Sequence, residues 1–493
     1  MTRVSLAHTA PSYAGLAPPF GPGRRYPELV SLLGEELPTE APNGVYAGVR
    51  AALLGLGLDA DHFGDPSWNP IGALVSRGGR VVLKPNFIRH WNPNPKASVE
   101  SVVTHGAVLR AVADYAWLAL GAQGSVVIAE APQQDCSFAE MDRVAGLSEL
   151  VRYYAEAQER RLEVIDLRRE EVDTLDGVIV SRRPLPGDPA GYRAIDLGTR
   201  SFFQHADLDP ERLRGADYDP APTALHHMRG RNEYLLSETV LRADLIVNLP
   251  KLKTHKKTGV TLALKNLVGV NGDKNWLPHH CLGSVAEGGD EFPGAGRLDR
   301  WRSRGTEVAR RSLKRGAGVP LFRALRRLER AVRGDEFIRS GNWHGNRTTW
   351  RMVLDLNRCL YYSDAKGLYL DAERPVRRIL TLLDGIVAGE GAGPLAPRNV
   401  PLGVVLASMD PVALDLTAIR LMGFDEEKIP KVWEAMRDRG PRVTQVRDSR
   451  EVVVVEVDAK SFASRPRPLH ELEVLHPFAP HSGWSGHIER DPR

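Results

Sequence analysis

Cysteine is scarce in this sequence, and its few cysteines are too far apart to form a compact framework. Cys136, Cys281 and Cys359 are the three cysteines among 493 residues, and no CxxC spacing occurs. This argues against a disulfide scaffold, a zinc ribbon and a self-contained iron–sulfur module. We therefore expect no iron–sulfur cluster, and reduced thiols are typical of a cytoplasmic protein.

Long apolar runs are missing as well. No run approaches the length that a membrane-spanning helix needs. The first 27 residues contain no apolar stretch ahead of their prolines, so we do not expect a secretory signal. Both features predict a cytoplasmic protein, and they leave peripheral contact with a membrane open.

A strong excess of one charge is absent from the chain as a whole. The 66 Lys and Arg residues nearly balance the 62 Asp and Glu residues, which leaves a formal net charge of +4. The segment 297–333 differs, because it contains thirteen basic and three acidic residues, a local charge of +10 against −6 for the remainder. This segment needs an explanation of its own.

An apolar stripe runs through the second half of that basic segment. Leu321, Leu325, Leu328 and Val332 recur at helical spacing, which predicts an amphipathic helix with an arginine-rich face. Such a helix either docks on the core with its basic face in water or lies on an anionic membrane. We do not expect nucleic acid as a partner, because no base-stacking aromatics or recognition fold accompany the arginines.

Short continuous apolar runs alternate with helical patterns along much of the chain. The helical patterns are 103–120 and 411–422, and the strand-like runs are 80–83, 125–129, 162–167, 245–249, 379–383, 403–407 and 451–457. This rhythm predicts an α/β fold with a mainly parallel sheet, covered by helices on both faces. We divide the chain into an N-terminal extension (1–75), a first core part (76–276), a basic insertion or lid (277–347), a second core part (348–460) and a tail (461–493).

The most informative stretch is the basic run that follows the strand 245–249. In an extended segment, Lys251, Lys253 and His255 alternate onto one face, where their charges repel one another unless an anion lies between them. Because ligands of α/β proteins gather at the carboxyl ends of strands, we predict an anion site here. Lys251 would bind the ligand, together with Lys265 and Asn266, and Lys253 and His255 would be catalytic.

Two other strand ends carry candidate residues. Lys84 and Asn86 close the strand 80–83 and either bind an anionic group or lie in a solvated loop. His105 falls in the first turn of a helix that Thr104 would cap, where the helix dipole favours a neutral imidazole. His105 is therefore a candidate general base or an ordinary surface histidine.

Four carboxylates at predicted strand ends are candidate ligands of a divalent metal: Glu130, Asp384, Glu390 and Asp410. Each also has a simpler interpretation. Glu130 could pair with a lysine, and Asp410 precedes a proline at a helix start and could serve as an N-cap. Gly391 and Gly393 let the backbone approach a ligand closely, or they form a tight loop.

Four separated motifs together resemble the domain of unknown function 362 family. They are VVLKPNF (81–87), VVIAEAP (126–132), DLIVNLPKLKTH with TLALKNLVG (244–269), and LLDGIVAGEGAGP with ASMDPVALDLTAIRLMG (382–394 and 407–423). The resemblance implies a shared α/β core and no assigned reaction. Some relatives carry ferredoxin-type cysteine motifs, which this chain lacks. The KPN strand end also resembles the lactate racemase superfamily, which implies histidine and lysine around a nickel cofactor.

These observations lead to two main hypotheses. The first is an enzyme acting on an anionic small molecule, carboxylated or phosphorylated, with a divalent metal. The second is a non-catalytic anion-binding or scaffold protein that docks on an anionic membrane or partner through its Arg-rich helix. An isomerase or racemase with a bound organometallic cofactor is a third hypothesis.

Overall fold

The computed structural model describes residues 1–34, 43–175, 178–215, 219–294 and 340–491, with short pieces between 296 and 323. The predicted Arg-rich helix 321–333 lies outside the described residues apart from Arg323. Within the described part of the chain, no helix is both long enough and apolar enough to cross a membrane.

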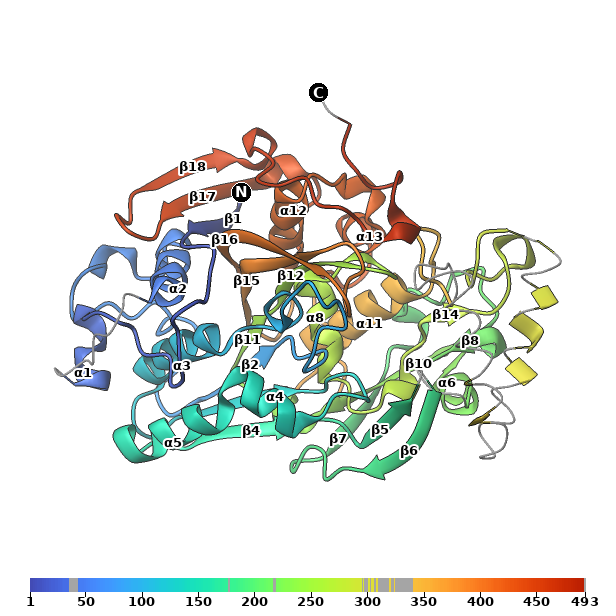
Figure 1. The fold of residues 1–493 in the computed structure, drawn as a ribbon, viewed down its shortest axis with the longest axis horizontal. Coiled ribbons are helices and arrows are strands. Elements are labelled where there is room, and N and C mark those ends of the chain that lie inside the picture. Colours follow the sequence, from blue (N-terminus) through green and yellow to red (C-terminus); the bar gives the residue numbers. More distant parts are fainter. Residues whose placement is uncertain are drawn as a thin grey trace.

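One eleven-stranded sheet organises the molecule (Figure 1). Its main path, in spatial order, is β18 (Ser464–Pro468), β17 (Val452–Asp458), β1 (Thr2–His8), β16 (Arg398–Ser408), β15 (Ile379–Glu390), β11 (Leu245–Leu249), β2 (Arg80–Pro85), β3 (Ser125–Glu130) and β4 (Leu162–Asp166). Two further strands, β12 (Lys251–His255) and β13 (Gly259–Val260), attach beside β15. In Figure 1 the sheet descends from β18 and β17 through β16 and β15 to β2 and β4.

The α/β class is confirmed, with a parallel core inside a mixed sheet. The strands β15, β11, β2, β3 and β4 run parallel to one another. By contrast, β16 is antiparallel to both β15 and β1, and β18 is antiparallel to β17. Since parallel strands end at the same edge, the core collects the carboxyl ends of four predicted strands in one place.

Side chains along the core strands alternate between two apolar clusters, as the two-residue period of a strand requires. Val82 and Ile246 belong to one cluster, and Val81, Leu83 and Val247 belong to the other. Continuous apolar runs in the sequence therefore correspond to strands whose two faces are both packed.

The helices occupy the segments between these strands. They are α1 (Val30–Leu33), α2 (Gly44–Gly55), α3 (Gly106–Leu120), α4 (Phe138–Ala145), α5 (Leu147–Gln158), α6 (Ala221–His226), α7 (Glu238–Leu241), α8 (Leu262–Asn266), α11 (Thr349–Tyr362), α12 (Pro411–Leu421) and α13 (Pro430–Arg437). Helix α3 packs on β2 and β3, whereas α8 packs on β11, β12 and α12. The short α8 thus connects the parallel core to the helix that follows β16.

Smaller sheets fill the segment that the sequence presents as turn-rich. They pair β5 (Glu170–Leu175) with β6 (Val178–Pro184), β7 (Tyr192–Asp196) with β10 (Arg231–Ser237) and β9 (His227–Met228), and β8 (Leu213–Arg214) with β14 (His280–Cys281). The last pair joins this elaboration to the beginning of the basic insertion.

Two expectations about strands are wrong. No strand is predicted before residue 80, yet β1 lies inside the sheet between β17 and β16. The strand predicted at 379–383 continues to Glu390, so Asp384 lies within β15 rather than after it. The two misses have different causes: polar residues interrupt the apolar residues of β1 (TRVSLAH), so it has no continuous apolar run, and Gly385 and Gly389 look like the end of a strand.

Candidate functional site

The carboxyl ends of the parallel strands bring three predicted polar residues together. In the register of the sheet, Asn248 of β11 lies opposite Lys84 of β2, and β3 follows β2 in parallel and ends at Glu130. Lys84 and Asn248 are fully buried and Glu130 nearly so. The ends of β11, β2 and β3 thus bring Asn248, Lys84 and Glu130 to one edge of the sheet.

Lys84 and Glu130 form a buried ion pair at the centre of this edge. The Lys84 ammonium donates to a carboxylate oxygen of Glu130 and, at 2.7 Å, to the Pro85 carbonyl. Burial lowers the pKa of Lys84, and the Glu130 charge opposes that shift. The pair lies against the backbone of Gly269, where a Cβ atom would stand 1.9 Å from a Glu130 oxygen. A side chain at position 269 would therefore displace the Glu130 carboxylate and disturb its pairing with Lys84.

Asn266 connects these strand ends through its amide group. Its oxygen accepts from the Asn86 amide at 2.7 Å, and its nitrogen donates to the Asn248 oxygen at 2.8 Å. Asn248 in turn donates to the carbonyl of Ala263, at 3.1 Å. This network orients Asn86 and Asn266 relative to Lys84. This buried hydrogen-bonded network fixes the geometry of the amides, so Asn86 does not lie in a solvated loop, and within the described structure its Oδ1 accepts no hydrogen bond.

A buried ion pair from the second core part anchors α8, which carries Lys265 and Asn266. Asp415 of α12 accepts from the backbone amides of Ala263, at 2.7 Å, and Leu264, at 3.4 Å, and pairs with Lys431 at 2.5 Å. A carboxylate near the first amides of a helix stabilises that end. Leu262 has a left-handed backbone (φ 53°), a strained conformation that often marks functional sites.

A second buried cluster surrounds Asp384 in β15. Lys251 pairs with Asp384 at 3.0 Å and donates to the Tyr13 hydroxyl at 2.8 Å, and that hydroxyl donates to Asp384. The backbone amide of His105 donates to Asp384 at 3.1 Å, and the His105 ring stacks on Tyr13 at 4.0 Å. Lys251 is therefore neutralised by a protein carboxylate and leaves no charge free for a ligand.

Lys253 lies in the electrostatic field of residues from both ion pairs, which are Lys84 and Glu130 in the first and Lys251 in the second. Its ammonium donates to the Val102 carbonyl and is fully buried. Burial lowers the pKa of Lys253 well below its usual value, and Lys251 and Lys265 lower it further. No carboxylate pairs with Lys253 among the residues that the structure describes.

Lys265 and Lys274 complete a group of cations around Glu130. Lys274 donates to the Ala131 carbonyl at 2.7 Å, and Lys265 has no hydrogen-bond or ion-pair partner within the described ranges. Both keep some accessible surface. Burial, then the neighbouring Lys274 and Lys84, lower the pKa of Lys265 to about 7. Burial also lowers the pKa of Lys274 to about 8, against the opposing charge of Glu130.

The two candidate histidines are neutral. His105 is itself the N-cap of α3, because its Nδ1 accepts from the Ala107 amide at 3.1 Å; the expected cap, Thr104, instead donates to the Leu249 carbonyl. His255 Nδ1 accepts from the Lys257 amide at 3.0 Å. Burial lowers the pKa of His105 to about 4, and burial and nearby lysines lower that of His255 well below its usual value.

Since Nδ1 is an acceptor in both rings, each neutral imidazole carries its proton on Nε2. His105 keeps some accessible surface, and His255 is 6% exposed. Each ring can therefore offer an N–H donor from Nε2 without bringing a further positive charge into the lysine cluster.

The four candidate metal ligands have separate partners. Asp410 caps α12 and accepts from Thr444 at 2.7 Å, and Glu390 pairs with Arg398 at 3.1 Å and accepts from the Ala479 amide at 2.9 Å. Glu130 pairs with Lys84 and Asp384 with Lys251. Within the described residues, no group of three His, Cys, Asp or Glu side chains could hold a metal ion. The metal stays a prediction.

Gly391 and Gly393 lie against β12. The Gly391 carbonyl accepts from the Thr254 hydroxyl at 3.0 Å, and the Gly393 carbonyl accepts from the Lys256 amide at 3.0 Å. A Cβ atom at Gly393 would stand 2.1 Å from the Thr254 carbonyl oxygen. Close packing of this loop on β12 accounts for Gly393, and a ligand-binding role for either glycine stays a prediction.

Tyr13, Lys274 and His279 are additional residues at the site. Tyr13 escaped notice because it lies in a Pro- and Gly-rich stretch far from the strands that it contacts. Lys274 follows the basic run that begins after the strand 245–249, but its Asn-Gly-Asp-Lys context is also typical of a turn. His279 donates from Nδ1 to the Leu277 carbonyl at 2.8 Å and faces the field of Lys257 and Lys265, which together with burial lowers its pKa to about 3.

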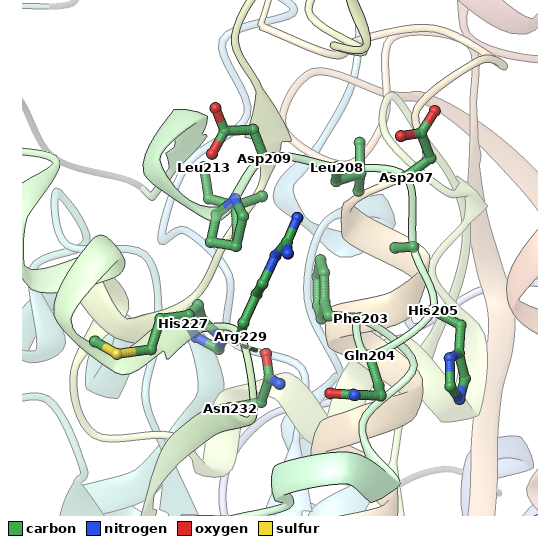
Figure 2. Close-up of a pocket in the computed structure, with 13 residues that line it drawn as sticks. Phe203, Gln204, His205, Asp207, Leu208, Asp209, Leu213, His227, Arg229 and Asn232 are labelled. Carbon is green, nitrogen blue, oxygen red and sulfur yellow. Dashed lines mark hydrogen bonds between the residues drawn. The ribbon is translucent and has the colours of Figure 1, made fainter.

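A separate cavity of about 720 Å³ lies between the loop 203–210 and the segment 227–232 (Figure 2). Figure 2 shows Arg229 extending into it beside Phe203, and His227 and Asn232 at its base. None of the predicted site residues lines this cavity. His227 bonds the Trp276 carbonyl at 2.6 Å, so the cavity backs onto the turn that carries Lys274.

Comparisons with known proteins give a family and no reaction. A family model described as "Domain of unknown function (DUF362)" matches residues 176–420. A thylakoid-associated protein of Synechocystis sp. is 22% identical over 253 residues, and this chain spans about half of its length (54%, and 50% of this chain). A crystal structure of a Thermotoga maritima protein aligns with a TM-score of 0.29 and 9% identity, over 68% of this chain and 51% of that one.

Proposed function

This chain belongs to the DUF362 family, a domain of unknown function, and from the chemistry of its site we propose that it is an enzyme acting on a carboxylated or phosphorylated small molecule. One observation carries the proposal. Lys253, Lys265 and Lys274 share the field of Glu130, which is already paired with Lys84, and the second carboxylate that acts on Lys274, Asp166, is paired with Arg168. An anion entering here would neutralise charges for which the described residues supply no counterion.

The neighbouring groups supply the functions that such a reaction needs. Lys253, Lys265 and Lys274 hold the anionic group, and Asn86 and Asn266 orient it from the strand ends. His255 and His105, both neutral with Nε2–H, donate hydrogen bonds to the bound anion without adding positive charge among the lysines. The scarcity of cysteine supports a cytoplasmic location for this reaction.

The affinity for a divalent anion is expected to fall as pH rises. Lys265 and Lys274, with pKa values of about 7 and about 8, are ammonium ions below those values and neutral amines above them. Sulfate keeps its charge across this range. Any change of its affinity with pH, measured by calorimetric titration, therefore comes from protonation of groups on the protein. We expect its affinity to drop by about tenfold or more between pH about 6 and about 9.

Proton uptake provides the control for this titration. At mildly alkaline pH, sulfate binding should draw protons onto Lys265 and Lys274, so the measured heat should depend on the ionisation enthalpy of the buffer. An affinity that stays constant over the same pH range, or an absence of sulfate binding throughout, would contradict the anion site.

Docking on an anionic membrane is a second candidate function. The segment 297–333 carries a local charge of +10, and the Synechocystis relative is named as a thylakoid-associated protein. Basic residues near a membrane surface each contribute about 1 kcal/mol of binding to anionic lipid. We propose that this segment gives the protein a peripheral, reversible contact with such a surface.

Vesicle sedimentation separates this docking from the anion site. Replacing Arg326 and Arg327 with Glu should reduce sedimentation with phosphatidylserine-containing vesicles severalfold and leave sulfate affinity unchanged. Replacing Lys253 and His255 with Ala should reduce sulfate affinity and leave vesicle sedimentation unchanged. Equal sedimentation of the wild-type protein with neutral and anionic vesicles would exclude electrostatic docking.

A further inference from the structure

Lys265 is the amine of this site that has no partner of its own. The ammonium groups of Lys84, Lys253 and Lys274 each donate to a protein oxygen, whereas Lys265 donates to none among the described residues and keeps accessible surface. Its position is nevertheless set, because Asp415 anchors the helix that carries it. A fixed, partly accessible and unbonded amine is available for covalent chemistry.

Charged and titratable groups from several elements surround Lys265, and they make its position strongly electropositive. Those that act on it or share its field are Lys84 (β2), Glu130 (β3), Lys253 and His255 (β12), Lys274, His279 and Lys431 (α13). Of these, Lys84 and Lys431 have carboxylate partners, and both histidines are neutral. Lys253 and Lys274 are left to stabilise a negative charge placed on Lys265.

We propose that Lys265 is a carbamylation site, at which the amine takes up carbon dioxide and becomes an anionic carbamate held by Lys253 and Lys274. This inference rests on the proposed function, because it uses the same group of cations. It adds a regulation: carbon dioxide and the anionic ligand compete for the site, since each supplies the negative charge that the lysines lack.

The step balances without an oxidant or a cofactor. The lone pair of the neutral Lys265 nitrogen attacks the carbon of CO₂ and forms an N–C bond, and one C=O electron pair moves onto oxygen. The nitrogen then releases one proton to solvent. The product is R–NH–COO⁻, so a group that can carry +1 is replaced by one that carries −1.

The neutral amine is the form that reacts, and Lys265 reaches it near neutral pH because its pKa is about 7. Ordinary surface lysines titrate near pH about 10 and stay protonated under the same conditions. The exposed α-amino group of Met1 and the side chain of Lys274, whose pKa burial lowers to about 8, are other amines that can react. The assay must therefore separate both from Lys265.

Carbon NMR of the full-length protein with ¹³C-labelled bicarbonate, at mildly alkaline pH, provides this separation. We expect one carbamate resonance from the N-terminus in both wild type and Lys265→Arg, and a second resonance in wild type alone. Saturating sulfate should abolish the second resonance and leave the first. Alkylation with a trialkyloxonium salt, followed by peptide mass spectrometry, should place the trapped carbamate on Lys265 without recourse to a variant.

Failure of this inference can be distinguished from failure of the proposed function. Sulfate binding without a second resonance or a trapped adduct on Lys265 overturns carbamylation and leaves the anion site standing. If the protein neither binds sulfate nor forms the carbamate, both are overturned. A second resonance that persists in Lys265→Arg assigns that carbamate elsewhere and also overturns the inference.

Discussion

Replacing Glu130 with Gln is expected to lower the free energy of unfolding by about 3–5 kcal/mol, the usual effect of removing one partner of a buried ion pair. The Lys84 ammonium is fully buried and pairs with Glu130. Without that carboxylate, Lys84 would either stay charged beside Lys265 and Lys274 or lose its proton, and both states disfavour the fold. Urea unfolding at neutral pH measures the difference.

A double variant separates loss of the ion pair from loss of packing. Glu130→Leu combined with Lys84→Met removes both charges, and because apolar replacement of a buried pair is often neutral, much of the stability should return. Sulfate affinity of the double variant should fall, since Lys84 contributes to the positive field at Lys265. Equal stability of wild type and the single variant would mean that water or a bound anion already satisfies Lys84.

Replacing Lys265 with Met is expected to weaken sulfate binding by about tenfold to a hundredfold, the range for losing a charge-assisted contact in a desolvated site. The same change should leave the ligand-free protein equally or more stable. Lys265 has no partner within the described structure, and burial and nearby cations disfavour its charge. Thermal unfolding and calorimetry on one preparation test both expectations.

Lys428→Met is the matched control for that experiment. Lys428 is exposed and pairs with Asp425 at 3.5 Å, so its removal takes away one positive charge without touching the site. Surface pairs of this kind contribute about 0–1 kcal/mol. If Lys428→Met weakened sulfate binding as much as Lys265→Met, net charge rather than a built site would explain the binding.

A stability gain in Lys265→Met would show that repulsion among the buried lysines lowers the stability of the ligand-free protein. Buried lysines that repel one another lower stability, and a protein retains them when their arrangement serves a ligand. A loss of stability of several kcal/mol would instead show that Lys265 has a structural contact that outweighs its burial.

Local pattern alone determined much of the core. The apolar runs at 80–83, 125–129 and 245–249 became β2, β3 and β11, and the helical pattern at 103–120 became α3 with Gly121 after its end. These elements are set by side-chain period and by stop signals, which are properties of neighbouring residues. The meeting of Lys84, Asn248 and Glu130 followed from the parallel arrangement of these strands.

Only the tertiary structure decided which of the basic residues is available to a ligand. Lys251 and Lys265 look alike in the sequence, yet Asp384, over a hundred residues along the chain, pairs with Lys251 and nothing described pairs with Lys265. Likewise Tyr13 reaches Asp384 because the N-terminal strand inserts between β17 and β16. Local sequence establishes which residues can carry charge, whereas long-range packing decides which of those charges remain uncompensated, and that determines where an anion binds.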